Sequence, residues 1–234
     1  AFQPGIWYVM PVTRADHMQF VGGIANKSII ETHLFYRNLM DDIYSTYHTV
    51  QPTETPFPFT DVPESRWSYP YIQQLYDAGV VSGTSATTFE PTANVTRAQF
   101  VTMLAGLQGA DVSAYTSGKF ADVPADAWYA PYVNWAAENG VVYGVSDTEF
   151  APDAKISRQD MAAMLYRYAG QFGIQLGTGN PAITFTDEAD IADYALPAVE
   201  ALQRAGVISG MPDGSFQPYA TATREQACTV LCML

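Results

Sequence analysis

Arginines recur at one particular position in this 234-residue chain, directly after a threonine or serine at what reads as the start of a helix. They are Arg97 in VTRAQF, Arg158 in ISRQDM, Arg224 in ATREQA and, as a weaker candidate, Arg14 in VTRADH. A cation at a helix start faces the positive end of the helix dipole, at a cost of up to about 1 kcal/mol. Unpaired backbone N–H groups, the dipole and a guanidinium together suit a bound carboxylate or phosphate. The pattern therefore indicates an anion-binding site.

The residues around each arginine predict a capping box, in which the helix-capping hydroxyl and a side chain three residues later bind each other's backbone N–H groups. The expected pairs are Thr96 with Gln99, Ser157 with Asp160, and Thr223 with Gln226. Capping accounts for these residues but leaves the arginine unexplained. Its partner is either a ligand anion or an acid elsewhere in the fold, for which the candidates are Asp61, Asp122 and Asp187.

Comparison of the chain with itself reveals three copies of one unit. Residues 69–104, 130–165 and 196–231 align without a gap, and the distance from proline to arginine is 27 residues in each. A proline at the start and a glycine after the end predict a short helix such as 70–78. GVVSG, GVVYG and GVISG then predict a short extended stretch with tight bends. Apolar residues at helical spacing after the arginine predict a second helix.

One such helix pair cannot bury its apolar stripe alone, so three copies should pack around a shared axis. The predicted fold is all-α and mainly helical, with three helix-turn-helix repeats packed as a pseudo-threefold, three-pronged single domain. We expect the repeats to occupy residues 57–113, 114–177 and 178–234, and the single chain to close the arrangement as a monomer. Residues 1–56 are interpreted as a degenerate half-repeat or helical N-terminal segment, followed by a linker rich in proline and threonine.

Each repeat adds an aromatic residue, an aspartate and a glycine turn to its arginine. The positions are Trp67, Trp128 and Tyr194; Asp61, Asp122 and Asp187; and Gly83, Gly144 and Gly210. An indole ring can stack on the apolar face of a sugar while backbone groups at a turn bind its hydroxyls. The pattern is thus compatible with carbohydrate binding, although the tryptophans could equally belong to the core.

Charge and motifs exclude several other functions. The net charge of −13 argues against nucleic acid and anionic membranes as partners. The sequence has no apolar run of about 18 residues, which argues against membrane insertion. It also has no Gly-x-Ser-x-Gly, His-Glu-x-x-His or phosphate-loop motif, so no catalytic residues are expected. Asp41 and Asp42 are the least excluded acids for a glycosidase, which needs two carboxylates across a cleft.

The two cysteines, Cys228 and Cys232, are four residues apart on the last predicted helix and far from every histidine. A zinc site would need further ligands, so we expect neither a metal nor a cofactor, and small apolar packing instead.

The repeated motifs resemble the S-layer homology domains of bacterial cell-surface proteins. The matching strings are FTDV…W, AGVVSGTSATTFEPTANVTRAQF, NGVVYGVSDTEFAPDAKISRQDM and AGVISGMPDGSFQPYATATREQA, within about residues 57–234. The resemblance implies non-covalent binding of secondary cell-wall polysaccharide, often through ketal-linked pyruvate, and anchoring at the bacterial cell surface. It places the family's helix-start arginine at Arg97, Arg158 and Arg224, and makes the pyruvate carboxylate the anion.

This sequence departs from the family's usual Thr-Arg-Ala-Glu at Gln99 and Gln226, and Tyr194 replaces a tryptophan. We therefore expect the grooves built with Trp67 and Trp128 to bind. Two other functions stay open at this point: a protein-protein assembly module of a surface layer, and an accessory part of a surface glycan hydrolase.

Overall fold

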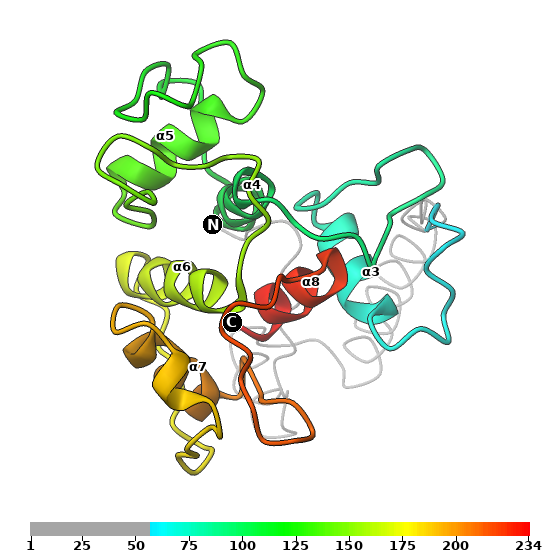
Figure 1. The fold of residues 1–234 in the computed structure, drawn as a ribbon. Helices are drawn as coiled ribbons and strands as arrows, with labels where there is room; N and C mark the ends of the chain where they lie inside the picture. Colours follow the sequence, from blue (N-terminus) through cyan, green and yellow to red (C-terminus); the bar gives the residue numbers. More distant parts are fainter. Residues whose placement is uncertain (1–56) are drawn as a thin grey trace, which may run out of the picture. The chain divides into compact units, whose positions relative to one another are not determined.

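The computed structural model describes residues 57–234. The half-repeat and linker predicted for residues 1–56, together with Arg14, lie outside this part. The described part is helical, without an extended strand, so the predicted all-α fold is confirmed (Figure 1). Its elements are α3 (Tyr69–Asp77), α4 (Arg97–Gln108), α5 (Ala130–Glu138), α6 (Arg158–Gln171), the 3-10 turn η1 (Glu188–Asp190), α7 (Leu196–Ala205) and α8 (Arg224–Met233).

The second helix of each repeat begins at the arginine, as predicted, because the preceding threonine or serine caps it. Thr96 and Thr223 form complete capping boxes with their glutamines. At Ser157 the predicted box is wrong: the hydroxyl accepts the Asp160 N–H at 3.2 Å, but the carboxylate does not return to the Ser157 backbone. The Asp160 side chain binds groups of the two other repeats instead.

The helices that pack together come from neighbouring repeats. The first helix of each repeat lies against the second helix of the preceding repeat, giving the pairs α4 with α5, α6 with α7, and α8 with α3. Figure 1 shows these three pairs arranged around a common centre, which confirms the three-pronged arrangement. Because α3 packs on α8, the first repeat closes on the last, and every prong is shared between two repeats.

A closed cycle of backbone hydrogen bonds joins the repeats at the centre. The Val95 N–H donates to the Ala222 carbonyl at 3.0 Å, Ala222 to Ile156 at 3.0 Å, and Ile156 to Val95 at 2.9 Å. All three side chains are fully buried. These residues directly precede the helix caps, so the cycle fixes the starts of α4, α6 and α8 relative to one another.

Candidate functional site

Each helix-start arginine reaches into the next repeat. Its Nε donates to the carbonyl of a buried phenylalanine at 2.8 Å, and its guanidinium lies 4.2–4.9 Å from the centroid of the same ring. The pairs are Arg97 with Phe150, Arg158 with Phe216, and Arg224 with Phe89. Burial lowers the pKa of all three arginines, which nevertheless remain cations. Part of the explanation for the arginine is therefore structural: it holds two repeats together.

The backbone N–H groups at these helix starts have protein partners. In α4, the N–H of Arg97 donates to the Ala154 carbonyl at 2.9 Å and that of Ala98 to Pro152 at 3.0 Å. At the starts of α6 and α8, the first backbone N–H groups likewise donate to carbonyls of a neighbouring repeat. The prediction of an anion site at unpaired N–H groups is wrong in this respect, because a neighbouring loop crosses each helix start. The arginine side chains remain the candidate anion ligands.

The recurring aspartates bind the backbone of their own repeats. Asp122 accepts the N–H groups of Phe150 at 2.8 Å and Ala151 at 2.6 Å, one on each carboxylate oxygen. Asp61 and Asp187 make the equivalent pairs of bonds. The alternative that these aspartates form ion pairs with the helix-start arginines is therefore wrong. Asp122 instead holds a loop in which Ala151 has a φ of 58°, an unusual conformation for a non-glycine residue.

The repeated aromatic residues are at the surface. The exposed fraction is 56% for Trp67, 60% for Trp128 and 52% for Tyr194, so the alternative that the tryptophans are core residues is wrong. The turn glycines have a packing role: a Cβ atom at Gly144 would lie 2.6 Å from Cε1 of Phe120, and one at Gly210 2.8 Å from Cε1 of Phe185. Gly83 meets the equivalent Phe59.

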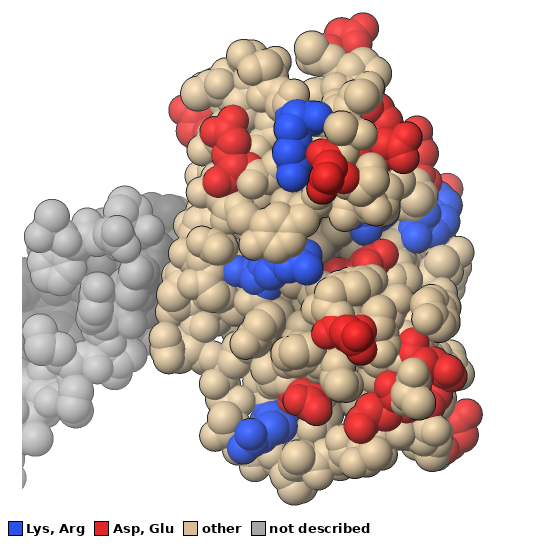
Figure 2. Space-filling model, turned by 60° about the vertical axis from the view of Figure 1, so that its left-hand side comes forward, with Lys and Arg blue, Asp and Glu red and all other residues tan. Residues whose placement is uncertain are grey.

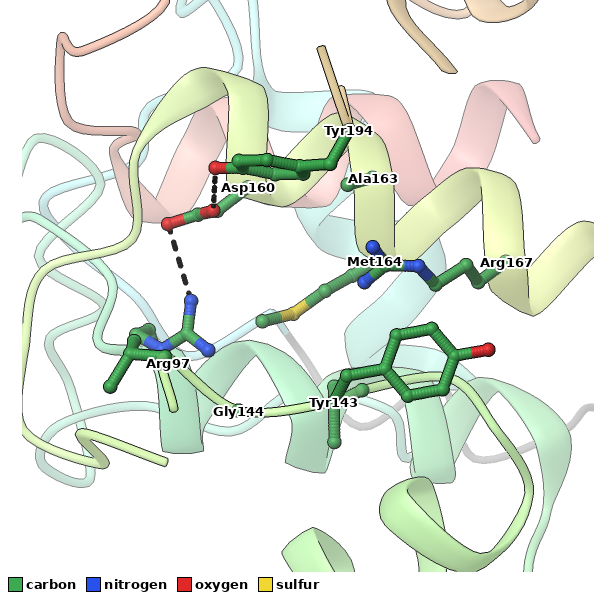
Figure 3. A pocket seen from close by; sticks show the side chains of 10 residues that line it. Arg97, Tyr143, Gly144, Asp160, Ala163, Met164, Arg167 and Tyr194 are labelled. Carbon is green, nitrogen blue, oxygen red and sulfur yellow. Dashed lines mark hydrogen bonds and ion pairs between the residues drawn. The ribbon is translucent and has the colours of Figure 1, made fainter. Parts of the chain in front are cut away.

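Two of the pockets in the described part each combine residues of all three repeats. The Arg97 pocket has a volume of about 350 Å³ (Figure 3), and the Arg158 pocket about 390 Å³. Both lie in the range of small-molecule sites, roughly 300–1,000 Å³. The first is lined by Arg97, Val142, Tyr143, Gly144, Val145, Asp160, Ala163, Met164, Arg167 and Tyr194. The second is lined by Trp67, Arg158, Met161, Gly206, Val207, Ile208, Ser209, Gly210, Met211, Phe216, Gln226, Thr229, Val230 and Met233.

These pockets bring together several of the predicted site residues. The structure places Arg97, Gly144 and Tyr194 around one, and Arg158, Gly210 and Trp67 around the other. Arg224, Trp128 and Gly83 line neither pocket, and the three aspartates stay in their own loops.

The three repeats also match a known family. The family model of the S-layer homology domain matches residues 58–101, 119–162 and 184–228. The chain belongs to this family. Its three S-layer homology (SLH) repeats thus combine a recognised sequence pattern with pockets at their junctions.

Relatives of these SLH repeats occur in much longer proteins. The chain is 37% identical over 187 residues to an endoglucanase of Bacillus sp. (strain KSM-635), covering 80% of this chain and 20% of the relative. It is 32% identical over 162 residues to a surface-layer 125 kDa protein of Lysinibacillus sphaericus, covering 68% and 13%. A cellulosome-anchoring protein of Acetivibrio thermocellus is 29% identical over 181 residues, covering 74% and 38%. The chain therefore spans a minor part of the length of these proteins.

The Arg158 pocket has a cation without an acidic partner. Arg158 uses Nε for the Phe216 carbonyl and Nη2 for the Ser209 carbonyl at 3.1 Å, and no described residue accepts a hydrogen bond from Nη1. The pocket lining contains no Asp or Glu. Trp67 supplies an exposed aromatic face, and Gln226 and Thr229 add polar groups. This SLH pocket can therefore receive an anionic ligand with one apolar face.

The Arg97 pocket already contains an ion pair. Nη1 of Arg97 donates to Oδ2 of Asp160 at 3.2 Å, and the hydroxyl of Tyr194 donates to Oδ1 of the same carboxylate at 2.6 Å. Burial raises the pKa of Tyr194, and the bond to Asp160 raises it further. Sequence reasoning missed this network because it assigned Asp160 to a capping box. Comparing Asp160 with Gln99 and Gln226 at the same repeat position would have revealed the exception.

The seam between the first and last SLH repeats has a second ion pair that the sequence did not indicate. Arg66 binds both carboxylate oxygens of Glu225, at 2.8 and 2.9 Å, and Ser68 donates to the same group at 2.7 Å. Glu225 is buried, with 6% of its surface exposed. The residues are more than 150 positions apart, so nothing local in the sequence signals the contact.

Charge and cysteine chemistry do not add another site among residues 57–234. Figure 2 shows Asp and Glu spread over one face of the molecule, with Lys and Arg in fewer, separate places. Cys228 is fully buried in the core, and burial raises the pKa of its thiol to about 12. Residues 57–234 contain no group of three or more potential metal-ligating side chains. None of the helices described has the length and apolar content needed to cross a bilayer.

Proposed function

We propose that this chain is a non-catalytic anchoring module that binds an acidic cell-wall polysaccharide in the pockets between its repeats. Membership of the SLH family indicates the bacterial cell surface and a role in anchoring. One relative is a cellulosome-anchoring protein and another a surface-layer protein, which supports the same role here. The recognised group is a carboxylate on a sugar, such as a ketal-linked pyruvate.

The observation that carries this proposal is the Arg158 pocket. The accessible edge of the Arg158 guanidinium binds the carboxylate, and the exposed Trp67 ring receives the apolar face of the sugar. The net charge of −13 opposes the approach of an acidic polymer. Affinity must therefore come from short-range contacts inside pockets rather than from the overall charge.

Catalysis is not part of the proposal. The endoglucanase relative is an enzyme, but the match covers 20% of it. Of the acids that recur in the repeats, Asp122 and its two equivalents are each held by two backbone N–H groups. Both oxygens of each carboxylate are therefore used to hold a loop of its own repeat, whereas a glycosidase needs two carboxylates that face each other across a cleft. An accessory role beside a separate catalytic domain is compatible with the anchoring function.

The proposal is tested by co-sedimentation of the full chain with purified cell wall, before and after mild acid removes its pyruvate ketals. We expect binding to the untreated wall only. Trp67→Ala should weaken it at least tenfold, equivalent to about 1.4 kcal/mol. Tyr219→Ala is the matched control, because Tyr219 is an exposed aromatic residue (68%) outside both pockets and should bind as the original chain does.

Arg158→Lys tests the arginine while keeping its charge. Lysine cannot present a planar fork to a carboxylate, so we expect weaker binding in a protein whose fold is verified by circular dichroism. If the chain sediments equally with both walls and neither substitution changes the result, the carboxylate-binding proposal is wrong. A protein-protein assembly role would then account better for the repeats.

A further inference from the structure

The Arg97 pocket differs in polarity or charge from the Arg158 pocket, most strongly at four of the equivalent lining positions. Gapless alignment of the repeats relates the residues lining one pocket to those lining the other. The pairs are Tyr143 with Ser209, Asp160 with Gln226, Arg167 with Met233, and Tyr194 with Trp67. Each of these four changes introduces a charge or a phenol where the Arg158 pocket has a neutral or apolar group. The two pockets therefore differ in the chemistry they offer a ligand.

In the Arg97 pocket, the helix-start arginine is a poor ligand for an incoming carboxylate. Only 4% of its surface is exposed, and Asp160 binds its Nη1. A second carboxylate at the same guanidinium would lie beside the first, and like charges at that separation repel each other. Tyr194 holds Asp160 in place from the other side. The ion pair thus occupies the position that is open in the Arg158 pocket.

Arg167 is the remaining cation of this pocket. Its guanidinium carbon lies 4.6 Å from the centroid of the Tyr143 ring, a cation-π contact that holds the group in a defined place. No residue among 57–234 accepts a hydrogen bond from it or forms an ion pair with it. Figure 3 shows Arg97 and Arg167 on opposite sides of the pocket, with Met164 between them. The N–H groups of Arg167 are therefore available where those of Arg97 are not.

We propose that the Arg97 pocket is a second carboxylate-sugar subsite in which the carboxylate binds Arg167, and not the helix-start arginine. This inference rests on the proposed function and extends it, because it assigns a different anion ligand to each pocket. Met164 provides an apolar floor between the two arginines, and the exposed Tyr143 supports the guanidinium from below. Tyr143 and Arg167 belong to the same repeat, which places the whole anion site on the turn before α6 and on α6 itself.

The test follows the Nε–Hε signals of the arginines by nuclear magnetic resonance in the full 15N-labelled chain. The probe is a glycoside carrying a ketal-linked pyruvate, and its neutral methyl ester is the ligand control. We expect the Arg167 and Arg158 signals to shift with the acid and not with the ester. Arg167→Met, which installs the residue found in the third repeat, should weaken binding in the Arg97 pocket about tenfold or more and leave the Arg158 titration unchanged.

Arg204→Met is the matched control, since Arg204 is exposed and lines neither pocket; both titrations should persist in it. If Arg97 shifts and Arg167→Met changes the affinity less than twofold, the carboxylate binds Arg97 and the inference is wrong. If Arg158 alone titrates, the inference fails while the proposed function stands. If no arginine responds, the proposed function fails as well.

Discussion

Replacement of Asp122 should destabilise the domain even though sequence reasoning placed this residue in the binding site. Its carboxylate accepts two backbone N–H groups, at 2.8 and 2.6 Å. Hydrogen bonds to a charged group contribute roughly 1.5–3 kcal/mol each. Because Asp122 is only partly buried, we take the lower end for both, about 3 kcal/mol for Asp122→Ala. In a domain of this size about 3 kcal/mol corresponds to a Tm lower by roughly 6–12 °C.

Differential scanning calorimetry of the full chain measures this shift. Asp122→Asn keeps one acceptor oxygen, so its Tm should lie between those of the original chain and Asp122→Ala. Asp126→Ala is the control, because Asp126 is an exposed acid nearby and should change Tm by less than about 1 °C. Well below its Tm, Asp122→Asn should bind the wall polymer as the original chain does. A Tm equal to that of Asp126→Ala, or lost binding in a folded protein, would refute the structural role.

Three other predictions concern acids with defined partners. Glu225→Gln should lower stability by about 2 kcal/mol in urea unfolding, because the amide cannot accept both bonds from Arg66 as a charged group does. Asp160→Asn should lower the pKa of Tyr194, measured by its ultraviolet absorbance, since the carboxylate contributes to raising it. Ser215→Ala should raise the carboxyl pKa of Asp213, followed by carbon NMR. The pKa of Asp213 lies below its ordinary value in the folded chain. The ionised carboxylate therefore stabilises the fold slightly above pH 4, and this stabilisation is lost as the pH falls through the folded-state pKa.

The sequence predicts those features of the fold whose causes are local. Thr96 and Gln99 lie within one helical turn of each other, so their capping box can be deduced from spacing alone, and the helix start at Arg97 follows. The packing of α3 on α8 depends instead on residues far apart in the chain. Periodicity identifies a buried stripe on each helix but does not identify the helix that covers it. The pairing between repeats therefore required the structure.

The candidate site was predictable to a similar extent. The arginines, the exposed aromatic residues and the turn glycines were found because they recur in register. Their roles depended on groups that recurrence does not reveal. The Arg97 N–H has a partner only because the chain near Ala154 crosses the start of α4. Asp122 lies 29 residues from Ala151, where its carboxylate is used. Arg167 was missed because its position does not carry an arginine in the other repeats, so a search for recurring residues does not find it.

The choice of arginine at the helix start follows from how its donors are divided. In Arg158, which lines the pocket, Nε binds the Phe216 carbonyl and Nη2 the Ser209 carbonyl, while Nη1 has no hydrogen-bond acceptor among residues 57–234. A lysine ammonium has a single nitrogen and could not bind the neighbouring repeat along one edge and present a separate edge to a ligand. A cation near the positive end of the helix dipole has an unfavourable electrostatic energy. The hydrogen bonds of the guanidinium, and the carbonyls that accept the N–H groups at the helix start, offset this energy. One guanidinium can thus join two repeats and still keep a donor for the proposed carboxylate, so the contact between the repeats and the pocket depend on the same residue.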